Sequence, residues 1–494
     1  MTTRKIFGIF NSRPLAIATL YLAAGILLGV YRPPLVAVWF CCLALSALYL
    51  YLFKILSYRA LPLVLICLCL SLPLLAYPTY LDKNLCYDKN VTAEGRILEA
   101  VYGEKDNEYL VDDLFINGER YGGKMKVTSS YEFECGERIF LKGYLKTYDF
   151  SSDTYSLKRI CYREYYDLSV NVAYSLSYQG LPFREKIMNY VKKGFAENAD
   201  YQTSAFTMSV LFGESGGLES LSAYRETNLA HLFAVSGLHV GTLTAALYFI
   251  LVKIFRRRKN SPTVFISLCG VLAFYSYLCG FTPSVIRALI MTVIAALSRP
   301  LRFYPDRLSI LGVAAITSLA VRPLWLFDVS FLLSYSAILG IILLQPALER
   351  GLSKTKTPSK IKSALSMNLA VSAAVMPVSA YFFGKVSLLS LPLSLFFIPF
   401  VSLLFTCFFI LSPFAGLPFV AYPLVPLSLG VKLCDGLVNL FDKLDAYFNV
   451  GYGLLPLAFW FIALFLTSDL CLLKKGKYSA ALCAVGGAAV LLFI

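Results

Sequence analysis

The sequence predicts an integral membrane protein that is mostly α-helical and polytopic, with one small extracytoplasmic β-barrel inserted after the first helices. The 494 residues are 58% hydrophobic and 15% charged, whereas soluble globular proteins average about 45–50% apolar and about 25% charged residues. Many apolar runs approach the roughly 20 residues that a spanning helix needs. A single polar insert, residues 82–180, interrupts these runs.

The apolar runs predict about 13 transmembrane segments. Three of them precede the insert (residues 1–81), and residues 181–494 hold about ten more after an amphipathic segment at Phe183–Asn198. Basic residues collect on the cytoplasmic side of membrane proteins. Basic clusters at the N-terminus and at 256–259, 299–307, 354–362 and 474–477 place the N-terminus in the cytoplasm and the insert outside. We therefore expect a multi-pass protein of the cytoplasmic membrane, with the lipid bilayer as its first partner.

The insert alternates apolar and polar residues with the period of a β-strand around residues 91–97, 124–128 and 139–145. Asn117-Gly118 and Gly122-Gly123 break these runs, as turns do. The pattern predicts a barrel of five or six strands. Thirteen tyrosines lie between Tyr87 and Tyr178; they serve equally well to stack on single-stranded nucleic acid or to fill strand faces and the membrane–water boundary.

The net charge of +15 is unevenly distributed. The insert carries 13 Lys and Arg against 17 Asp and Glu, a net charge of −4, and the rest carries 32 against 13, a net charge of +19. Ordinary cytoplasmic-loop bias explains much of this excess. The insert also holds three cysteines, which allow one disulfide, with Cys135 and Cys161 as the candidate pair, and one free thiol if the insert is extracytoplasmic.

The stretch from Arg225 to Gly241 is the prime candidate site, because polar side chains in an apolar segment are expensive and are usually functional. It contains both histidines of the chain, His231 and His239, together with Ser236 and Gly237. No third ligand gives these histidines a metal pattern of the H-E-x-x-H kind. Ser236 and His239 are three residues apart and could touch on a helix, but no orienting carboxylate follows, so a serine hydrolase is the weaker interpretation.

The small residues of this stretch favour a structural interpretation over a metal site or a hydrolase. Ser236, Gly237 and Gly241 let another helix approach closely, and Gly237 permits a helix break whose backbone lines a cavity. The histidines then become polar wall groups, or interhelical hydrogen-bonding groups without a substrate. Arg287, after Gly280-Phe281-Thr282-Pro283, either extends to the interface or faces an aqueous path and contacts phosphate. No P-loop is present, so we expect no nucleotide or other cofactor and no metal.

The segment A-H-L-F-A-V-S-G-L-H-V-G, Ala230–Gly241, resembles the signature of the ComEC-type competence family, membrane channels that carry single-stranded DNA into bacteria during natural transformation. Leu211–Leu218, Gly280–Ala288, Phe327–Gly340 and Met376–Ser390 are similar to other blocks of that family. The resemblance implies an oligonucleotide-binding (OB)-like insert and a DNA path contacted by Arg225, His231, Ser236, Gly237, His239 and Arg287. It also implies a DNA receptor protein on the outer face and a cytoplasmic helicase-like ATPase, and it leaves room for a homo-oligomer.

Three departures from the family accompany this resemblance. The chain ends in an apolar run at Ile494, so we do not expect the C-terminal metallo-β-lactamase-like domain of many members; a separate protein would then supply the nuclease, and this chain would not be an enzyme. Leu332 stands where the family has Gln and Ser394 where Asn is common, which puts two polar pore contacts in doubt. A small-solute or lipid-precursor transporter on the same scaffold is the alternative, followed by an intramembrane hydrolase.

Overall fold

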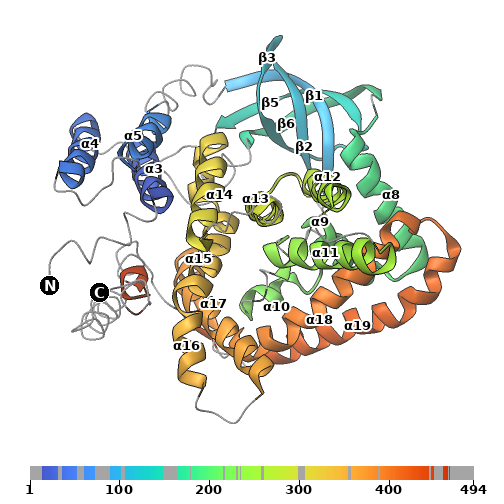
Figure 1. Cartoon of the computed structure of the whole chain (residues 1–494). Coiled ribbons are helices and arrows are strands. Elements are labelled where there is room, and N and C mark those ends of the chain that lie inside the picture. The colour runs from blue at the N-terminus through green and yellow to red at the C-terminus, as the bar shows by residue number, and fades with distance from the viewer. Residues whose placement is uncertain are drawn as a thin grey trace.

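The computed structural model describes residues 14–31, 36–52, 60–72, 89–101, 106–147, 164–178, 180–214, 217–227, 229, 232–233, 235–256, 261–298, 306–353, 358–387, 390–443, 447–449, 460–464 and 467. Within these residues a β-barrel lies at one end of a helical body, over helices α12 and α13, and the N-terminal helices lie to one side of α14 (Figure 1).

The barrel is a closed ring of five strands with a sixth strand attached. The strands are β1 (Lys89–Val101), β2 (Asn107–Ile116), β3 (Glu119–Tyr121), β4 (Lys124–Ser129), β5 (Glu137–Thr147) and β6 (Glu164–Tyr178). The order around the ring is β1-β5-β6-β4-β2, closed by β1–β2, and β3 pairs with β2. The β4–β6 pair is parallel and the other pairs are antiparallel. The expected five- or six-strand barrel is confirmed, and its strands include the three predicted segments.

Alternating side chains build the barrel core, as the sequence period requires. Val91, Ala93, Ile139 and Leu141 point inward and are at most 3% exposed. Gly95 allows β1 to approach β2, because a β-carbon there would overlap Val111 and the carbonyl oxygen of Asp112. The barrel therefore closes over an apolar interior that is separate from the cores of the helical body.

Two apolar clusters hold the helical body together. The N-terminal helices α3 (Pro14–Tyr31), α4 (Val36–Leu52) and α5 (Ala60–Ser71) share one cluster with α14 (Arg307–Val321), the 3₁₀ turn η3 (Pro323–Phe327) and α15 (Val329–Leu343). Gly312 permits the close contact of α14 with α3, since a β-carbon there would lie 3.2 Å from the carbonyl oxygen of Leu15.

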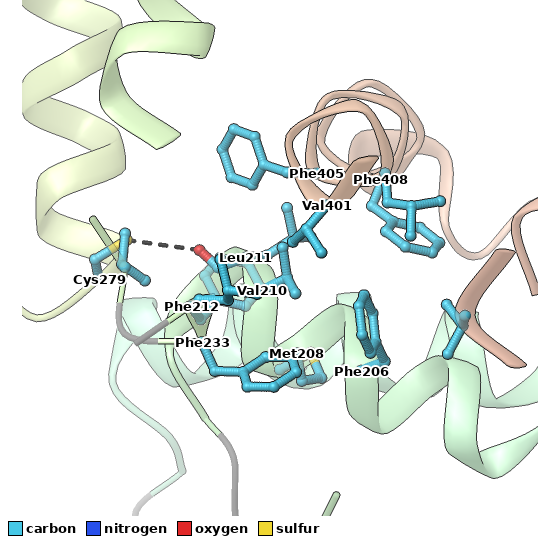
Figure 2. Close-up of a cluster of buried hydrophobic side chains, with 14 of the residues drawn as sticks. Phe206, Met208, Val210, Leu211, Phe212, Phe233, Cys279, Val401, Phe405 and Phe408 are labelled. Carbon is cyan, nitrogen blue, oxygen red and sulfur yellow. Dashed lines mark hydrogen bonds between the residues drawn. The ribbon is translucent and has the colours of Figure 1, made fainter. Parts of the chain in front are cut away.

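The larger cluster surrounds the candidate site. Its elements are α8 (Phe183–Asn198), α9 (Tyr201–Phe212), α10 (Leu221–Glu226), α11 (Gly237–Phe249), α12 (Pro262–Leu278), α13 (Pro283–Ser298), α18 (Ser390–Leu411) and α19 (Ala421–Asp442). Figure 2 shows its centre, where side chains of α9 face those of α18. Phe206 meets Phe233 edge to face with ring centroids 5.4 Å apart, and Cys279 donates to the Leu211 carbonyl oxygen at 3.7 Å.

The remaining elements extend or connect these helices. They are η2 (Ile250–Ile254), α16 (Gln345–Leu352), α17 (Ser359–Phe383), β7 (Lys385–Ser387), η4 (Ser412–Phe414), η5 (Pro418–Val420) and β8 (Tyr447–Asn449). The π-helical turn η2 continues α11 directly. Helix α17 passes through Pro377 without ending, and its C-terminal Gly384 adopts the left-handed conformation with φ 65°.

Among the described residues, four helices are long and apolar enough to cross a bilayer: Gly237–Ile254, Ile361–Phe383, Pro392–Phe414 and Pro418–Asp442. The bent pair α15–α16, with an angle of 46°, would make a fifth. Six more apolar helices are shorter. The predicted total of about 13 spans therefore stays a prediction, because many of the predicted runs form helices below the usual spanning length and the last two runs lie largely outside the described residues.

Candidate functional site

Helix α11 begins at the centre of the signature stretch with a reciprocal cap. Ser236 is extended (φ −110°, ψ 167°), and its Oγ accepts a hydrogen bond from the Leu238 N–H at 3.2 Å. The His239 Nδ1 atom accepts from the Ser236 N–H at 3.1 Å. Together they form a capping box, in which two otherwise unpaired N–H groups are satisfied. These residues of the Ala230–Gly241 segment therefore start helix α11 at Gly237.

The His239 side chain is buried between helices. Its side chain is 2% exposed, and its ring lies 4.7 Å from that of Phe405 on α18. Because Nδ1 accepts from a backbone N–H, the neutral ring carries its proton on Nε2. The Ser236 Oγ atom lies 3.4 Å from the same Nδ1, so the pair that suggested a hydrolase does touch. The lone pair that a general base would use is, however, already shared with the closer backbone group.

Arg287 lies directly against the start of α11. A β-carbon at Gly237 would overlap the Arg287 Nη2 atom and lie 3.5 Å from Cζ, so any larger residue would require the guanidinium to shift. The Arg287 side chain is 4% exposed. Its Nη1 donates to the Ser334 carbonyl oxygen at 2.6 Å, and Cζ lies 5.8 Å from the Tyr335 ring centre. The structure thus brings together Gly237 and Arg287, which are 50 positions apart in the sequence.

The Arg287 guanidinium has no acidic partner within the part of the chain that the structure describes. Its Nε is buried without a hydrogen bond, and the ion pairs of the described residues do not include it. A buried charge without a counter-ion is costly. Arginine is a residue type suited to bind anions such as phosphate.

Three helix N-termini meet beside this arginine. The Ser284 hydroxyl, in the first turn of α13, donates to the Val235 carbonyl oxygen just before α11. Ser330, in the first turn of α15, donates to the Ser284 hydroxyl at 3.3 Å. Each helix N-terminus carries a partial positive charge. The starts of α11 and α13 therefore add to the charge of Arg287, whereas the start of α15 is capped by the buried Asp328 carboxylate, which accepts from the Phe331 N–H at 3.0 Å.

The other predicted site residues lie elsewhere or outside the described residues. Arg225 is exposed in the last turn of α10. His231 and Cys161 fall outside the described residues, so the role of His231 and the disulfide stay predictions. Cys135 is half-buried just before β5.

The structure also shows where the two departures from the family pattern lie. The Ser394 hydroxyl donates to the Asn368 side-chain oxygen on α17 at 3.2 Å, so this position keeps a polar contact between helices. Leu332 is half-buried on α15 and packs against the apolar cluster of the N-terminal helices. In the described residues no group of three His, Cys, Asp or Glu side chains could hold a metal ion.

Sequence reasoning missed a buried carboxylate on α19. Asp435 is 3% exposed and accepts hydrogen bonds from the Gln202 amide (2.8 Å), the Ser220 hydroxyl (2.8 Å) and the Tyr224 hydroxyl (3.0 Å). These donors belong to α9, the turn before α10, and α10. One charged side chain in the apolar run 417–440 was the available signal, together with Lys432, which pairs with Asp200 at 3.6 Å. Asp435 thus ties α19 to the segment that leads into the signature.

A second missed carboxyl, Glu214, lies in the G-E-S-G-G loop after α9. Gly213 ends α9 in the left-handed conformation with φ 82°, and the Ser209 hydroxyl donates to the Glu214 carbonyl oxygen at 2.9 Å. Burial, and then repulsion from Glu99 of the barrel, raise the pKa of the Glu214 carboxyl to about 7, against the opposing effect of Arg184 and Lys192 on α8. This carboxyl therefore sits where the barrel meets the helical body.

Three curated proteins are similar to parts of this chain. The chain is 24% identical over 275 residues to ComE operon protein 3 of Bacillus subtilis (56% of this chain, 33% of the relative). It is 33% identical over 144 residues to recombination protein 2 of Haemophilus influenzae (28% and 18%), and 31% identical over 184 residues to an uncharacterized protein of Aquifex aeolicus (36% and 43%). The matches thus span less than half of each relative. No solved structure matches the chain significantly.

The family model described as Competence protein matches residues 210–475, more than half of the chain and all of the site around α11, α13 and α15. The chain therefore belongs to the Competence protein family.

Proposed function

We propose that this protein is the channel through which single-stranded DNA crosses the bacterial cytoplasmic membrane during natural transformation. Membership of the Competence protein family supports a role in DNA uptake. The observation that carries the channel proposal is the buried Arg287, which has no acidic partner among the described residues and lies beside the N-termini of α11 and α13. DNA carries a phosphate at every nucleotide, and arginine and helix N-termini are the groups that bind phosphate without reading sequence.

The barrel supports the same proposal. We interpret its closed five-strand ring, with the parallel β4–β6 pair, as an OB-like barrel, and OB folds are five-stranded barrels that bind oligonucleotides. In this proposal the barrel lies outside the membrane and receives the strand, and the N-terminus lies in the cytoplasm. A DNA receptor on the outer face, a cytoplasmic helicase-like ATPase and a separate nuclease complete the machinery, and the chain itself acts as a conduit and not as an enzyme.

The test compares substitutions of Arg287 with a matched exposed arginine. Arg287→Ala removes a charge-assisted contact of about 1.5–3 kcal/mol, so we expect at least a roughly tenfold loss of labelled-DNA uptake and of transformation. Arg287→Lys keeps the charge but not the fork of donors and should be intermediate. Arg307→Ala, at an exposed position where α14 begins, is the control and should behave as wild type.

Membrane levels of each variant are measured by immunoblot, so that loss of protein is not read as loss of transport. Normal uptake by Arg287→Ala at normal levels would refute the assigned path. DNA binding at the cell surface should persist in this variant, because the defect lies in translocation. If surface binding and uptake fall together, the arginine does not act where we place it.

The contact between Ser236 and His239 keeps a second candidate, an intramembrane hydrolase, open to test. A serine-directed activity probe should label the wild-type chain at Ser236 if the pair is catalytic, and His239→Ala should abolish that label. Under the channel proposal, Ser236 remains unlabelled. The His239 Nδ1 atom that would have to activate the Ser236 hydroxyl already accepts a hydrogen bond from the Ser236 backbone N–H.

A further inference from the structure

The outer face of the β5–β6 strand pair is the starting point. Because Ile139, Leu141 and Leu145 point into the barrel, the alternate residues of β5 point outward. These are Arg138, Phe140, Lys142, Tyr144 and Lys146, a strict alternation of basic and aromatic side chains. Tyr144 is 38% exposed, and on the neighbouring strand Val172 is 47% and Tyr174 is 50% exposed.

Aromatic rings on this face are already arranged as a platform. Phe140 and Tyr174 are register partners and their rings are stacked, with centroids 4.9 Å apart and planes 20° apart. Tyr144 lies four residues further along β5, about 13 Å away at the usual rise of a strand. Planar bases stack on exposed rings of this kind whatever their sequence.

Lys142 lies between the stacked pair and Tyr144, and no ion pair involves it among the described residues. Its register partners are Thr92 on β1 and Val172 on β6, both uncharged. The nearest diagonal acid, Glu94, faces Arg138 at 3.7 Å. Lys146 is different, because Asp167 is its register partner. A lysine with neutral neighbours between aromatic rings matches a ligand with planar rings and a negative backbone.

The opposite side of the barrel lacks these properties. On the outward face of β1 to β4 three basic side chains are paired with carboxylates: Arg96 with Asp112 at 3.1 Å, Lys126 with Glu108 at 2.7 Å and Arg120 with Asp113 at 2.9 Å. A phosphate approaching that face would have to displace an existing carboxylate. The β2–β4 face corresponds to the strand face that OB folds commonly use for oligonucleotides, so this chain differs from the common arrangement.

We infer that single-stranded nucleic acid binds the outer face of β5–β6, with bases stacked on Tyr174, Phe140 and Tyr144 and a phosphate on Lys142. This inference rests on the proposed function for its substrate, DNA, and adds the surface that receives it. A duplex should bind less well, because its bases are already stacked on one another.

The experiment uses the full chain in lipid nanodiscs and a fluorescent (dT)20 oligonucleotide as the probe. Tyr174→Ala and Phe140→Ala should each weaken binding at least roughly fivefold, the lower range for loss of one stacked base. Tyr174→Trp should preserve or tighten binding, and (dT)20 should quench the fluorescence that it adds. Lys142→Ala should lower the slope of log affinity against log salt by about 0.7.

Matched controls come from the other face and from the ligand. Lys126→Ala and Tyr121→Ala, on β4 and β3, should leave (dT)20 affinity unchanged. An abasic 20-mer keeps the phosphates without the bases, so it should bind at least tenfold more weakly and should not respond to Tyr174→Ala. Thermal unfolding of each variant shows whether the barrel remains folded, and Tyr174→Trp keeps the test valid if Phe140→Ala does not fold.

Several outcomes would overturn the inference. Unchanged (dT)20 affinity in Tyr174→Ala and Lys142→Ala excludes this face. If brominated lipids and not (dT)20 quench the fluorescence added by Tyr174→Trp, the face rests on the bilayer; if a photo-crosslinker at position 174 joins two copies of the chain, it is a self-association surface. In each case the Arg287 experiment is unaffected, so failure here is distinct from failure of the proposed channel.

Discussion

The guanidinium of Arg287 and the missing side chain of Gly237 share one space at the start of α11. Because a methyl group at Gly237 would overlap Nη2, Gly237→Ala must displace either the arginine or the helix end. Overpacking of this kind typically costs about 1–3 kcal/mol. We expect a lower unfolding temperature in detergent and a loss of DNA uptake close to that of Arg287→Ala.

Gly241→Ala is the matched control for that substitution. The prediction that Gly241 admits a neighbouring helix is wrong, because nothing lies within 4 Å of a β-carbon there, one turn further along the same helix. Alanine favours a helix over glycine by about 1 kcal/mol, so this variant should be neutral or slightly more stable. Equal damage from both substitutions would show that α11 needs flexibility at its glycines and not space for Arg287.

The buried carboxylate of Asp435 should be a major contributor to stability. Asp435→Ala leaves two buried hydroxyl donors unpaired, each costing about 1–3 kcal/mol, together with the half-buried Gln202 amide, so we expect the variant to accumulate poorly or to unfold well below wild type. Tyr224→Phe removes one of the three donors and should cost about 1 kcal/mol. Tyr422→Phe, at an 81% exposed position near the start of α19, should have no effect on thermal unfolding.

The capping hydrogen bond of His239 predicts that His239→Gln destabilises the protein less than His239→Ala. Glutamine is the common partner in a capping box, so His239→Gln should retain the bond to the Ser236 N–H and most of the unfolding temperature. His239→Ala loses both this bond and the contact with Phe405, and should cost more than the approximately 0.5–2 kcal/mol typical of a cap. If glutamine is as damaging to uptake as alanine while stability is retained, the imidazole itself has a role in transport.

The raised pKa of Glu214 predicts a pH dependence of stability. Because its folded-state pKa is about 7 and its ordinary value is 4.5, the folded chain holds this proton more tightly than the unfolded chain. The resulting stabilisation is fully present below pH 4.5 and is lost as the pH rises through about 7. It amounts to about 3 kcal/mol at most.

Glu214→Gln cannot ionise and should flatten that part of the profile, measured as unfolding temperature between pH 4.5 and 8. The exposed Glu219→Gln, in the same loop region, is the control and should leave the profile unchanged. A wild-type profile without a decline in this range would mean that the carboxyl is more hydrated than its position beside the barrel indicates.

The barrel could be predicted from the sequence because its strands alternate apolar and polar residues, a pattern that depends only on neighbouring positions. Alternation around residues 91–97, 124–128 and 139–145 marks β1, β4 and β5, and the amphipathic segment Phe183–Asn198 became α8 with the same bounds. The span count was less accessible: hydropathy marks apolar runs, but it does not say where Pro, Gly and packing divide a run into helices too short to span.

Only part of the candidate site could be predicted from the sequence. The signature pointed to Ser236, Gly237, His239 and Arg287, yet not to the capping box or to the contact between Gly237 and the guanidinium. These depend on how α11, α13 and α15 converge, and local periodicity contains no information about that. Asp435 was missed for the same reason, since its donors lie more than 200 residues earlier in the chain.

The parallel β4–β6 pair sets an order of events during synthesis. β6 is the last strand made, yet it lies between β5 and β4 in the ring, so the ring stays open until residue 169 has joined β4. Until then β4 has a free edge that other chains could occupy. A pause in synthesis before β6 (Glu164–Tyr178) has emerged from the ribosome would prolong that interval, whereas a pause after β6 has emerged would not.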